Sequence, residues 1–209
     1  MVLTPAASDG FWSAEVQVML RPFAAYQRLA SEPAPADGWG FLQRPLFQAF
    51  LLGAIASLGI ARRLSLPLVL SAGIAWSFVP ALQIASVLAV RRSVGHRSLP
   101  PGRSIDLYFM GQGPWLLWLL VLVAVQGLLP PERAAAAMGP KGPLFWSFAV
   151  PLLWSPLLTY AFLRGALQAS RARALRALGL HTALIWGVVL GFFQLSGQLG
   201  PRLAGLFKG

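Results

Sequence analysis

Long apolar blocks alternate with short, arginine-containing segments along most of this chain. The blocks are about 20 residues long, the length at which an α-helix crosses the roughly 30 Å hydrocarbon core of a bilayer. Charged residues lie only near block edges, Arg44 in the first and Asp106 in the third. The block bounds are Phe41–Ala61, Leu66–Val90, Ile105–Leu129, Pro143–Leu163 and Leu180–Leu199. This pattern predicts an all-α polytopic transmembrane helix bundle with about five spans.

Two features predict how the spans pack and bend. The link around Arg62–Ser65 is so short that the first two spans should form an antiparallel hairpin. Small residues suggest tight packing in it: Gly53, Ser57, Ala72, Gly73 and Ser77. Because proline inside a helix removes a hydrogen bond and bends the helix, Pro151 and Pro156 make the fourth span the one expected to bend most.

The segment before the first span has the pattern of an amphipathic helix. The spacing places five apolar and aromatic residues on one helix face: Trp12, Val16, Met19, Phe23 and Tyr26. Pro22 predicts a break, with a second helix that begins at this proline. We expect the segment to lie in the headgroup layer of the membrane. Arg21 and Arg28 would then sit at the headgroups, and Phe23 and Tyr26 would anchor the segment to lipid or to the bundle.

Composition supports a membrane protein. The 209 residues are 56% hydrophobic and only 11% charged, with a mean hydropathy of +0.65, whereas soluble domains carry about 25% charged residues. A net charge of +11 would suggest nucleic acid in a soluble protein. Here the arginines separate apolar blocks, so topology and lipid headgroups explain them better, and we expect no nucleic-acid partner.

The distribution of basic residues predicts the orientation. With five spans, one side holds eleven of the 17 Lys and Arg residues: Arg21, Arg28, Arg44, Arg91, Arg92, Arg97, Arg103, Arg164, Arg171, Arg173 and Arg176. The other side holds six: Arg62, Arg63, Arg133, Lys141, Arg202 and Lys208. The positive-inside rule therefore places the N-terminus in the cytoplasm and the C-terminus outside. We expect a bacterial inner-membrane location.

The residues that could carry catalysis or bind a metal are few. The chain has no cysteine, and none of its six acidic residues lies deep in a span. Nothing nominates a nucleophile with a base, and no phosphate loop or HExxH helix is present. We therefore expect no enzyme and no metal site. His181, at the start of the fifth span, is the one cofactor candidate, as a ligand to haem or to a pigment, and the cofactor itself stays unknown.

Polar and small residues of the fifth span form another candidate site. Gln194 and Gln198 are four residues apart and share a helix face, where they could bond to neighbouring helices or line a groove for a lipid headgroup or small solute. Gly187 and Gly191 form a GxxxG pattern that permits close helix packing. These features favour a compact bundle or an oligomer without choosing between the two.

The N-terminal pattern resembles the Yip-domain family of five-span integral membrane proteins. It reads Arg21-Pro22-Phe23 followed by Tyr26, Leu29 and Pro33, ahead of five apolar blocks. The resemblance covers about residues 20–200 and implies a five-span protein with a cytoplasmic N-terminus. Eukaryotic members act with small GTPases, but the Asp-Leu-x-Gly-Pro motif that they carry before the first span is absent here. We therefore carry over the topology and no functional residues.

These observations divide the chain into residues 1–40 as a cytoplasmic segment, 41–200 as the transmembrane domain and 201–209 as a short tail. The first functional hypothesis is a non-catalytic membrane protein that acts as a scaffold, an accessory subunit or a Yip-like factor. Its partners would be membrane lipids and other membrane subunits, or further copies of this chain. The alternatives are a component of a solute or lipid transporter, and a pigment- or haem-binding subunit.

Overall fold

The structure is a computed structural model, and it describes residues 13–32, 40–94 and 99–206. Within the last helix, side chains are described as far as Phe192 and again at Gln194 and Leu195. The described residues form helices and turns and include no strand. The predicted all-α helical bundle is therefore confirmed.

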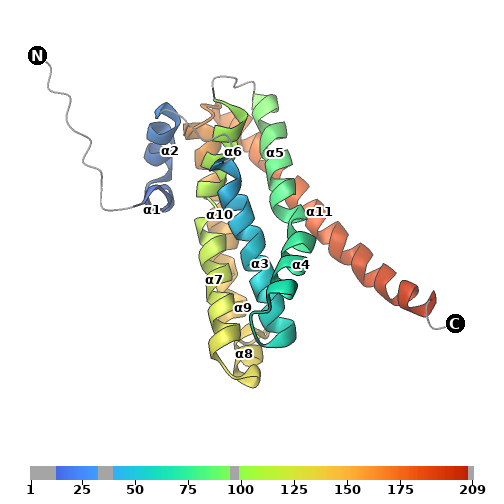
Figure 1. The fold of residues 1–209 in the computed structure, drawn as a ribbon. Coiled ribbons are helices and arrows are strands. Elements are labelled where there is room, and N and C mark those ends of the chain that lie inside the picture. The colour runs from blue at the N-terminus through green and yellow to red at the C-terminus, as the bar shows by residue number, and fades with distance from the viewer. Residues whose placement is uncertain (1–12, 33–39, 95–98, 207–209) are drawn as a thin grey trace, which may run out of the picture.

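The helices stand side by side in a bundle whose two ends differ (Figure 1). We call the end that carries α1, α2 and the start of α6 the upper end, and the end that carries α8 the lower end. The bounds are α1 Ala14–Leu20, α2 Pro22–Ser31, η1 Gly40–Leu42, α3 Gln43–Ala61, α4 Leu66–Trp76, α5 Phe78–Val94, α6 Pro101–Met110, α7 Gly113–Leu128, α8 Pro131–Met138, α9 Pro143–Ser147, α10 Ala149–Gly165 and α11 Arg171–Leu206.

The N-terminal segment breaks where the sequence predicts. Helix α1 ends at Leu20, and α2 begins at Pro22, whose fixed φ suits the first position of a helix. Ser13 caps α1 by accepting a hydrogen bond from the backbone N–H of Val16 at 3.4 Å. The predicted break at Pro22 is confirmed, whereas Trp12 of the expected apolar face lies outside the described residues.

Helices α3 and α4 form the predicted tight hairpin. A Cβ atom on Gly53 would lie 2.1 Å from the carbonyl oxygen of Val69, so only glycine permits this approach. The buried Ser57 hydroxyl closes the turn, because it donates to the Arg63 carbonyl at 2.8 Å and accepts from the Ser65 N–H at 2.9 Å. The prediction of close packing in this hairpin is confirmed.

Four helical segments among the described residues are long and apolar enough to cross a membrane: 40–61, 66–94, 143–165 and 171–192. A fifth is possible if α6 and α7 count as one broken span, since they meet at a 54° bend. This bend falls in the third predicted span. The expectation that the fourth span would bend most is therefore wrong, because Pro156 sits inside α10 without a break of that size.

Helix α11 extends further at both ends than the sequence predicts. It begins at Arg171 and runs to Leu206, whereas the expected span was 180–199 with a separate tail at 201–209. The basic segment after Ser170 forms its first turns. Its last part leans away from the bundle (Figure 1).

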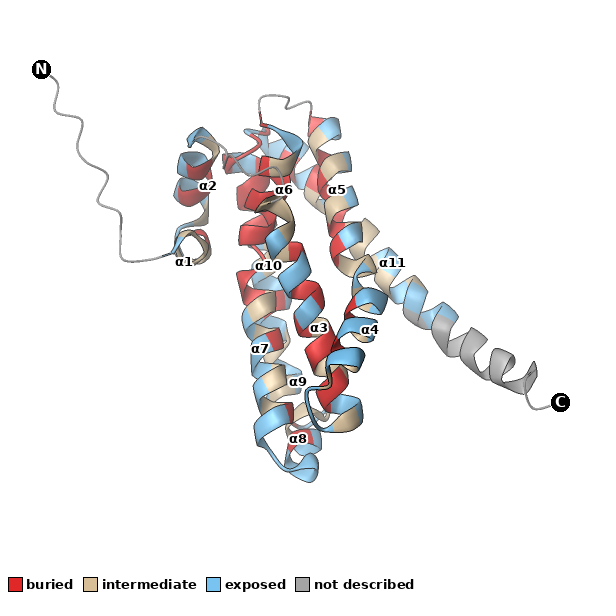
Figure 2. Ribbon diagram, in the orientation of Figure 1, coloured by how far each residue is buried: buried red, intermediate tan, exposed pale blue. Residues whose placement is uncertain are grey.

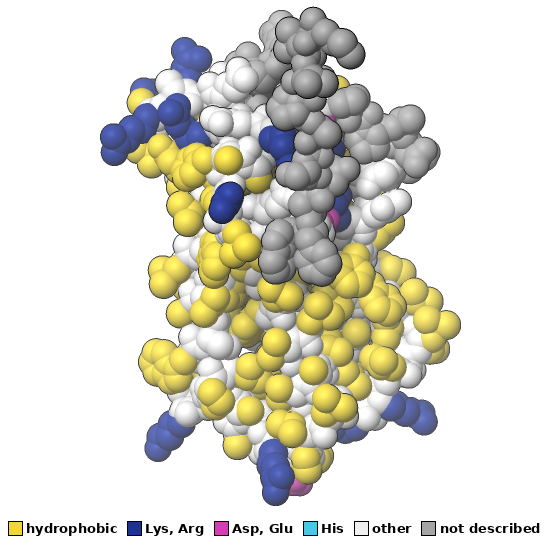
Figure 3. Space-filling view, turned by 90° about the vertical axis from the view of Figure 1, so that its left-hand side faces the viewer, with side chains coloured by type: hydrophobic (Ala, Val, Ile, Leu, Met, Phe, Trp, Pro, Cys, Tyr) yellow, Lys and Arg dark blue, Asp and Glu magenta, His cyan; other side chains and the backbone are white. Residues whose placement is uncertain are grey.

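Burial is concentrated at the upper end (Figure 2). Helix α6 is buried from Arg103 to Met110, because α2, α3, α5 and α10 pack around it. Further down the bundle the surface is mostly apolar side chains, with Lys and Arg near both ends (Figure 3). Exposed Leu70, Leu117 and Leu153 belong to this apolar surface. An apolar belt between basic ends is compatible with integration into a membrane.

Candidate functional site

A cavity of about 410 Å³ lies inside the bundle among α3, α4, α5, α6, α7, α10 and α11. Its polar lining residues are Gln48, Gln83, Tyr108, Gln112, Ser155, Thr159, His181 and Thr182. Its aromatic lining residues, Tyr108 aside, are Trp76, Trp115, Trp118, Phe148 and Trp186. No described lining residue is Asp, Glu, Lys or Arg. A concave, largely apolar space of this size with a few polar groups has the character of a small-molecule site.

The polar and aromatic lining residues occupy different levels of the bundle. Helices α7 and α11 run from the upper towards the lower end. Gln112 precedes Trp115 at the start of α7, and His181 precedes Trp186 in α11. Helix α10 and the α4–α5 pair run upwards (Figure 1). Here the aromatic residue comes first, since Phe148 precedes Ser155 and Trp76 precedes Gln83. The cavity therefore has a polar upper layer and an aromatic lower layer.

The lower layer is a set of aromatic rings around Trp115, which lies edge to face with Trp118 and Phe148 and tilted against Trp186. The ring centroids of Trp115 lie 6.2 Å from Trp118, 6.5 Å from Trp186 and 5.3 Å from Phe148. The Nε1–H of Trp118 donates to the Ser147 hydroxyl at 3.1 Å, which fixes the orientation of that indole. These rings offer flat apolar surfaces to whatever enters the cavity.

His181 joins three helices at the top of the polar layer. Its Nδ1 lies 2.7 Å from the Ser86 hydroxyl oxygen of α5, and its Nε2 lies 3.0 Å from the Tyr108 hydroxyl oxygen of α6. Both ring nitrogens are therefore hydrogen-bonded, so a haem or pigment metal would have to displace one of these partners. Ser86 is buried and does not line the cavity, so its hydroxyl has no access to a bound molecule.

Three buried polar atoms on cavity-lining residues have no hydrogen-bond partner among the described residues. They are Gln48 Oε1, Gln83 Oε1 and Ser155 Oγ. Gln83 donates through Nε2 to Gln112 Oε1 at 3.5 Å, a long contact that still directs its amide. Buried polar atoms are nearly always paired, so a cluster of unpaired ones needs an explanation.

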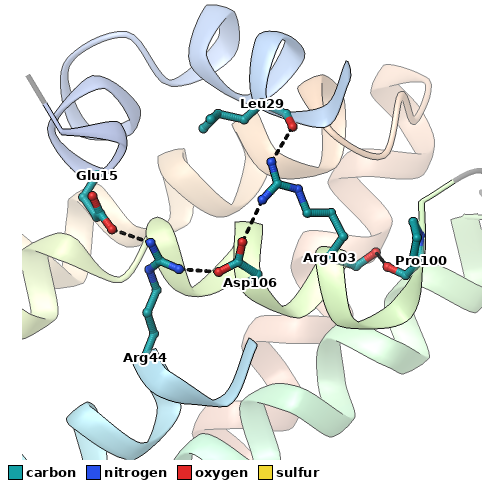
Figure 4. A network of polar contacts seen from close by, with 7 residues as sticks. Glu15, Leu29, Arg44, Pro100, Arg103 and Asp106 are labelled. Carbon is teal, nitrogen blue, oxygen red and sulfur yellow. Dashed lines mark hydrogen bonds and ion pairs between the residues drawn. The ribbon is translucent and has the colours of Figure 1, made fainter. Parts of the chain in front are cut away.

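A chain of charged side chains lies above the cavity and connects α1, α3, α6 and α2 (Figure 4). Arg44 bonds to Glu15 and to Asp106. Asp106 also accepts from Arg103 Nη1 at 2.9 Å, and Arg103 Nη2 donates to the Leu29 carbonyl at 2.8 Å. Arg103 and Asp106 are buried, so each needs the other.

Glu15 has a lowered pKa in this setting. Partial burial by itself raises the pKa, but the hydrogen bond and charge of Arg44 act in the opposite direction, together with bonds from the α1 backbone and Ser13. The net pKa lies below the ordinary value of 4.5, so Glu15 is ionised at neutral pH and holds α1 to Arg44.

The N-terminal helices pack directly against the break between α6 and α7. A Cβ on Gly111 would lie 2.3 Å from the Tyr26 hydroxyl, and one on Gly113 would lie 2.6 Å from Met19 Sδ. The two glycines therefore allow α1 and α2 to approach the backbone beside Gln112, which lines the cavity. This contact places the N-terminal segment over the upper end of the site.

The anchor residues predicted in α2 have different environments. Tyr26 faces the bundle and is 1% exposed, with its ring edge-on to Phe162 at 5.7 Å. Phe23 is 41% exposed and lies edge-on to Tyr160. Arg21 is exposed, and Arg28 bonds to Gln17 and Glu32. Phe23 and Tyr26 were expected to anchor the segment either to lipid or to the bundle, and Tyr26 packs against the bundle.

The glutamines and glycines singled out in the fifth span are not among the described residues that line the cavity. Gln194 is exposed and is not among the lining residues, and the side chain of Gln198 lies outside the described residues. A Cβ atom on Gly187 or Gly191 would meet no described atom within 4 Å, so neither glycine makes a close helix contact in the described part of the chain. Among the predicted site residues whose side chains are described, His181 is the one that lines the cavity.

The described residues include no group of three or more His, Cys, Asp or Glu side chains placed to hold a metal ion. The glutamines of three other spans were visible in the sequence as intramembrane polar groups, but no local signal shows that Gln48, Gln83 and Gln112 meet at one cavity. In comparisons with known proteins, no family model, no curated protein and no solved structure matches this chain.

Proposed function

We propose that this chain is a non-catalytic integral membrane protein that binds a small lipid-soluble molecule in its intramembrane cavity. The observation that carries the proposal is the 410 Å³ space, in which unpaired polar atoms lie above a layer of tryptophans. Because water-soluble solutes rarely match so apolar a lining, the ligand would come from the bilayer. This role develops the hypothesis of a lipid or solute transporter component.

A cavity-filling variant tests the proposal. Thr182→Phe adds a ring to a lining residue of α11, whereas Leu190→Phe makes a similar change at an exposed residue of the same helix. The wild type and Leu190→Phe should retain a molecule at a fixed ratio to protein, measured by mass spectrometry of organic extracts of the purified chain. Thr182→Phe should lose it. Equal extracts from all three proteins would refute the proposal.

We also propose that the upper end faces the cytoplasm of a bacterial inner membrane, as the basic residues and the Yip-like topology suggest. Because the chain has no native cysteine, single cysteines report accessibility directly. In intact cells an impermeant maleimide should label Lys141→Cys, in the loop between α8 and α9, and should label Ser170→Cys only after lysis. The reverse pattern would refute this orientation.

A scaffold or accessory-subunit role is the second candidate, and α11 favours it. This helix leans away from the bundle, and the Cβ positions of Gly187 and Gly191 face open space (Figure 1). Another membrane helix, from a partner or a second copy, could pack closely there. Gly187→Leu should then abolish association measured by crosslinking in membranes, and unchanged crosslinking would argue against this role.

A further inference from the structure

The lining of the cavity restricts the charge of its ligand. None of its described lining residues carries a formal charge, and the lining imidazole has both ring nitrogens hydrogen-bonded within the protein. A charged ligand would leave water for an apolar space without a counter-ion, which costs far more than a few hydrogen bonds return. The ligand is therefore neutral.

The unpaired polar atoms of the cavity restrict the hydrogen-bonding groups of the ligand. Gln48 and Gln83 are 5% and 7% exposed, and each has a carbonyl oxygen without a donor among the described residues. Since the Gln83 amide nitrogen is turned towards Gln112, its oxygen is the atom left for a ligand. The Ser155 hydroxyl adds a third unpaired atom, which can accept or donate. A ligand that satisfies this layer must donate hydrogen bonds.

The aromatic lower layer of the cavity restricts the shape of the ligand. Trp115, Trp118 and Trp186 surround the space below the amides, and the direction of α7 and α11 places them on the side away from α1 and α2. Indole rings pack well against flat rings and hydrocarbon chains. A molecule that fits both layers carries its donors at one end and its apolar bulk at the other.

Building on the proposed function, we propose that the cavity binds a neutral, lipid-soluble phenol or hydroquinone. A ring hydroxyl donates to the amide oxygen of Gln83, with the Gln48 amide oxygen as the acceptor for a second hydroxyl, and the hydrocarbon part lies among the tryptophans. No bond is made or broken in this binding. The polar groups select the hydroxylated form, because an etherified or oxidised ring cannot donate.

The test compares an alkyl hydroquinone, kept reduced, with its dimethyl ether, which has the same ring and chain but no donor. Binding to the full chain in nanodiscs is measured by tryptophan fluorescence, with empty nanodiscs as the blank. The hydroquinone should bind about tenfold more tightly or better, because the ether leaves buried acceptors unpaired. Equal affinity for the two probes would overturn the phenol assignment and leave cavity binding in place.

A matched pair of variants locates the effect. Gln83→Met keeps the side-chain length and removes the acceptor, so it should reduce the preference for the hydroquinone several-fold. Gln126→Met is the control, since Gln126 is also buried with an unpaired Oε1 but does not line the cavity. If Gln83→Met keeps the full preference for the hydroquinone, or if neither probe binds, the inference is overturned. The mass spectrometry of organic extracts tests the proposed function independently.

Discussion

The Nε2 atom of His181 on α11 lies 3.0 Å from the Tyr108 hydroxyl oxygen on α6, while its Nδ1 reaches Ser86 on α5. One imidazole thus links three helices that are far apart in the sequence. A neutral imidazole has one N–H and one lone pair, so one hydroxyl donates to the ring while the other accepts from it. The arrangement fixes the upper wall of the cavity.

Loss of the Tyr108 hydroxyl should destabilise the bundle. Tyr108→Phe leaves His181 Nε2 buried without its partner, and we expect the free energy of unfolding in detergent to fall by about 1–3 kcal/mol. Tyr160→Phe, the same chemical change on half-buried Tyr160 of α10, should change it by under about 0.5 kcal/mol. In a His181→Leu background Tyr108→Phe should have a smaller effect, and equal effects in both backgrounds would show that the two groups are not coupled.

Neutralising Asp106 should cost more than breaking an exposed ion pair. Asp106→Asn leaves the buried Arg103 guanidinium and Arg44 without their shared carboxylate, and removing one partner of a buried pair costs about 3–5 kcal/mol. Glu32→Gln is the control, because its pair with Arg28 is exposed and worth at most about 1 kcal/mol. Denaturant titration of the two variants should separate them clearly, and similar midpoints would contradict the importance of the network.

Much of the architecture follows from local sequence, and the site does not. The five apolar blocks, the break at Pro22 and the tight hairpin at Gly53 depend on residues close together in the chain, so periodicity and residue size predict them. The bend between α6 and α7 was missed although Gly111, Gly113 and Pro114 stand at it in the sequence. Tyr26 and Met19 pack against its two glycines.

The cavity was missed because the residues that form it are far apart in the chain. Tyr108 and Ser86 lie 73 and 95 residues from His181, so no spacing rule connects them. Helix periodicity marked Gln194 as part of a polar face, but that face is exposed because α11 leaves the bundle there. Glu15 pairs with Arg44, which lies 29 residues further along the chain, so no helix periodicity predicts this contact.

Attachment of α1 should weaken at acid pH through Glu15. The folded-state pKa of Glu15 is lowered below 4.5, so its contribution to stability is fully present above that value and is lost as the pH falls through the folded pKa. We expect wild type to be more stable than Glu15→Gln at about pH 6, and the margin to be smaller at about pH 3. These two pH values lie on either side of the ordinary glutamate pKa.

Chemical unfolding at the two pH values measures this difference. Asp106, which also bonds to Arg44, is present in both proteins. Glu132→Gln on α8 supplies the control, since Glu132 is an exposed glutamate in another helix. A stability difference for Glu15→Gln that persists unchanged at the lower pH would contradict the ion pair with Arg44.

Two glycines, Gly53 of α3 and Gly187 of α11, should respond oppositely to alanine. At Gly53 the new methyl group would lie 2.1 Å from the Val69 carbonyl oxygen, a backbone atom that moves only with the whole hairpin. We expect Gly53→Ala to lower the free energy of unfolding by about 1–3 kcal/mol, the usual cost of overpacking. At Gly187 no described atom lies within 4 Å, so the chain itself imposes no such cost.

Gly187→Ala should therefore leave stability unchanged or raise it by up to about 1 kcal/mol, because alanine favours the helix. Measured on the dispersed monomer in detergent, the pair separates packing within the chain from packing between chains. If Gly187→Ala destabilised the monomer, α11 would have to pack against its own bundle. If it weakened only self-association in membranes, the open glycine face would be the contact, and the accessory-subunit role would gain its first direct support.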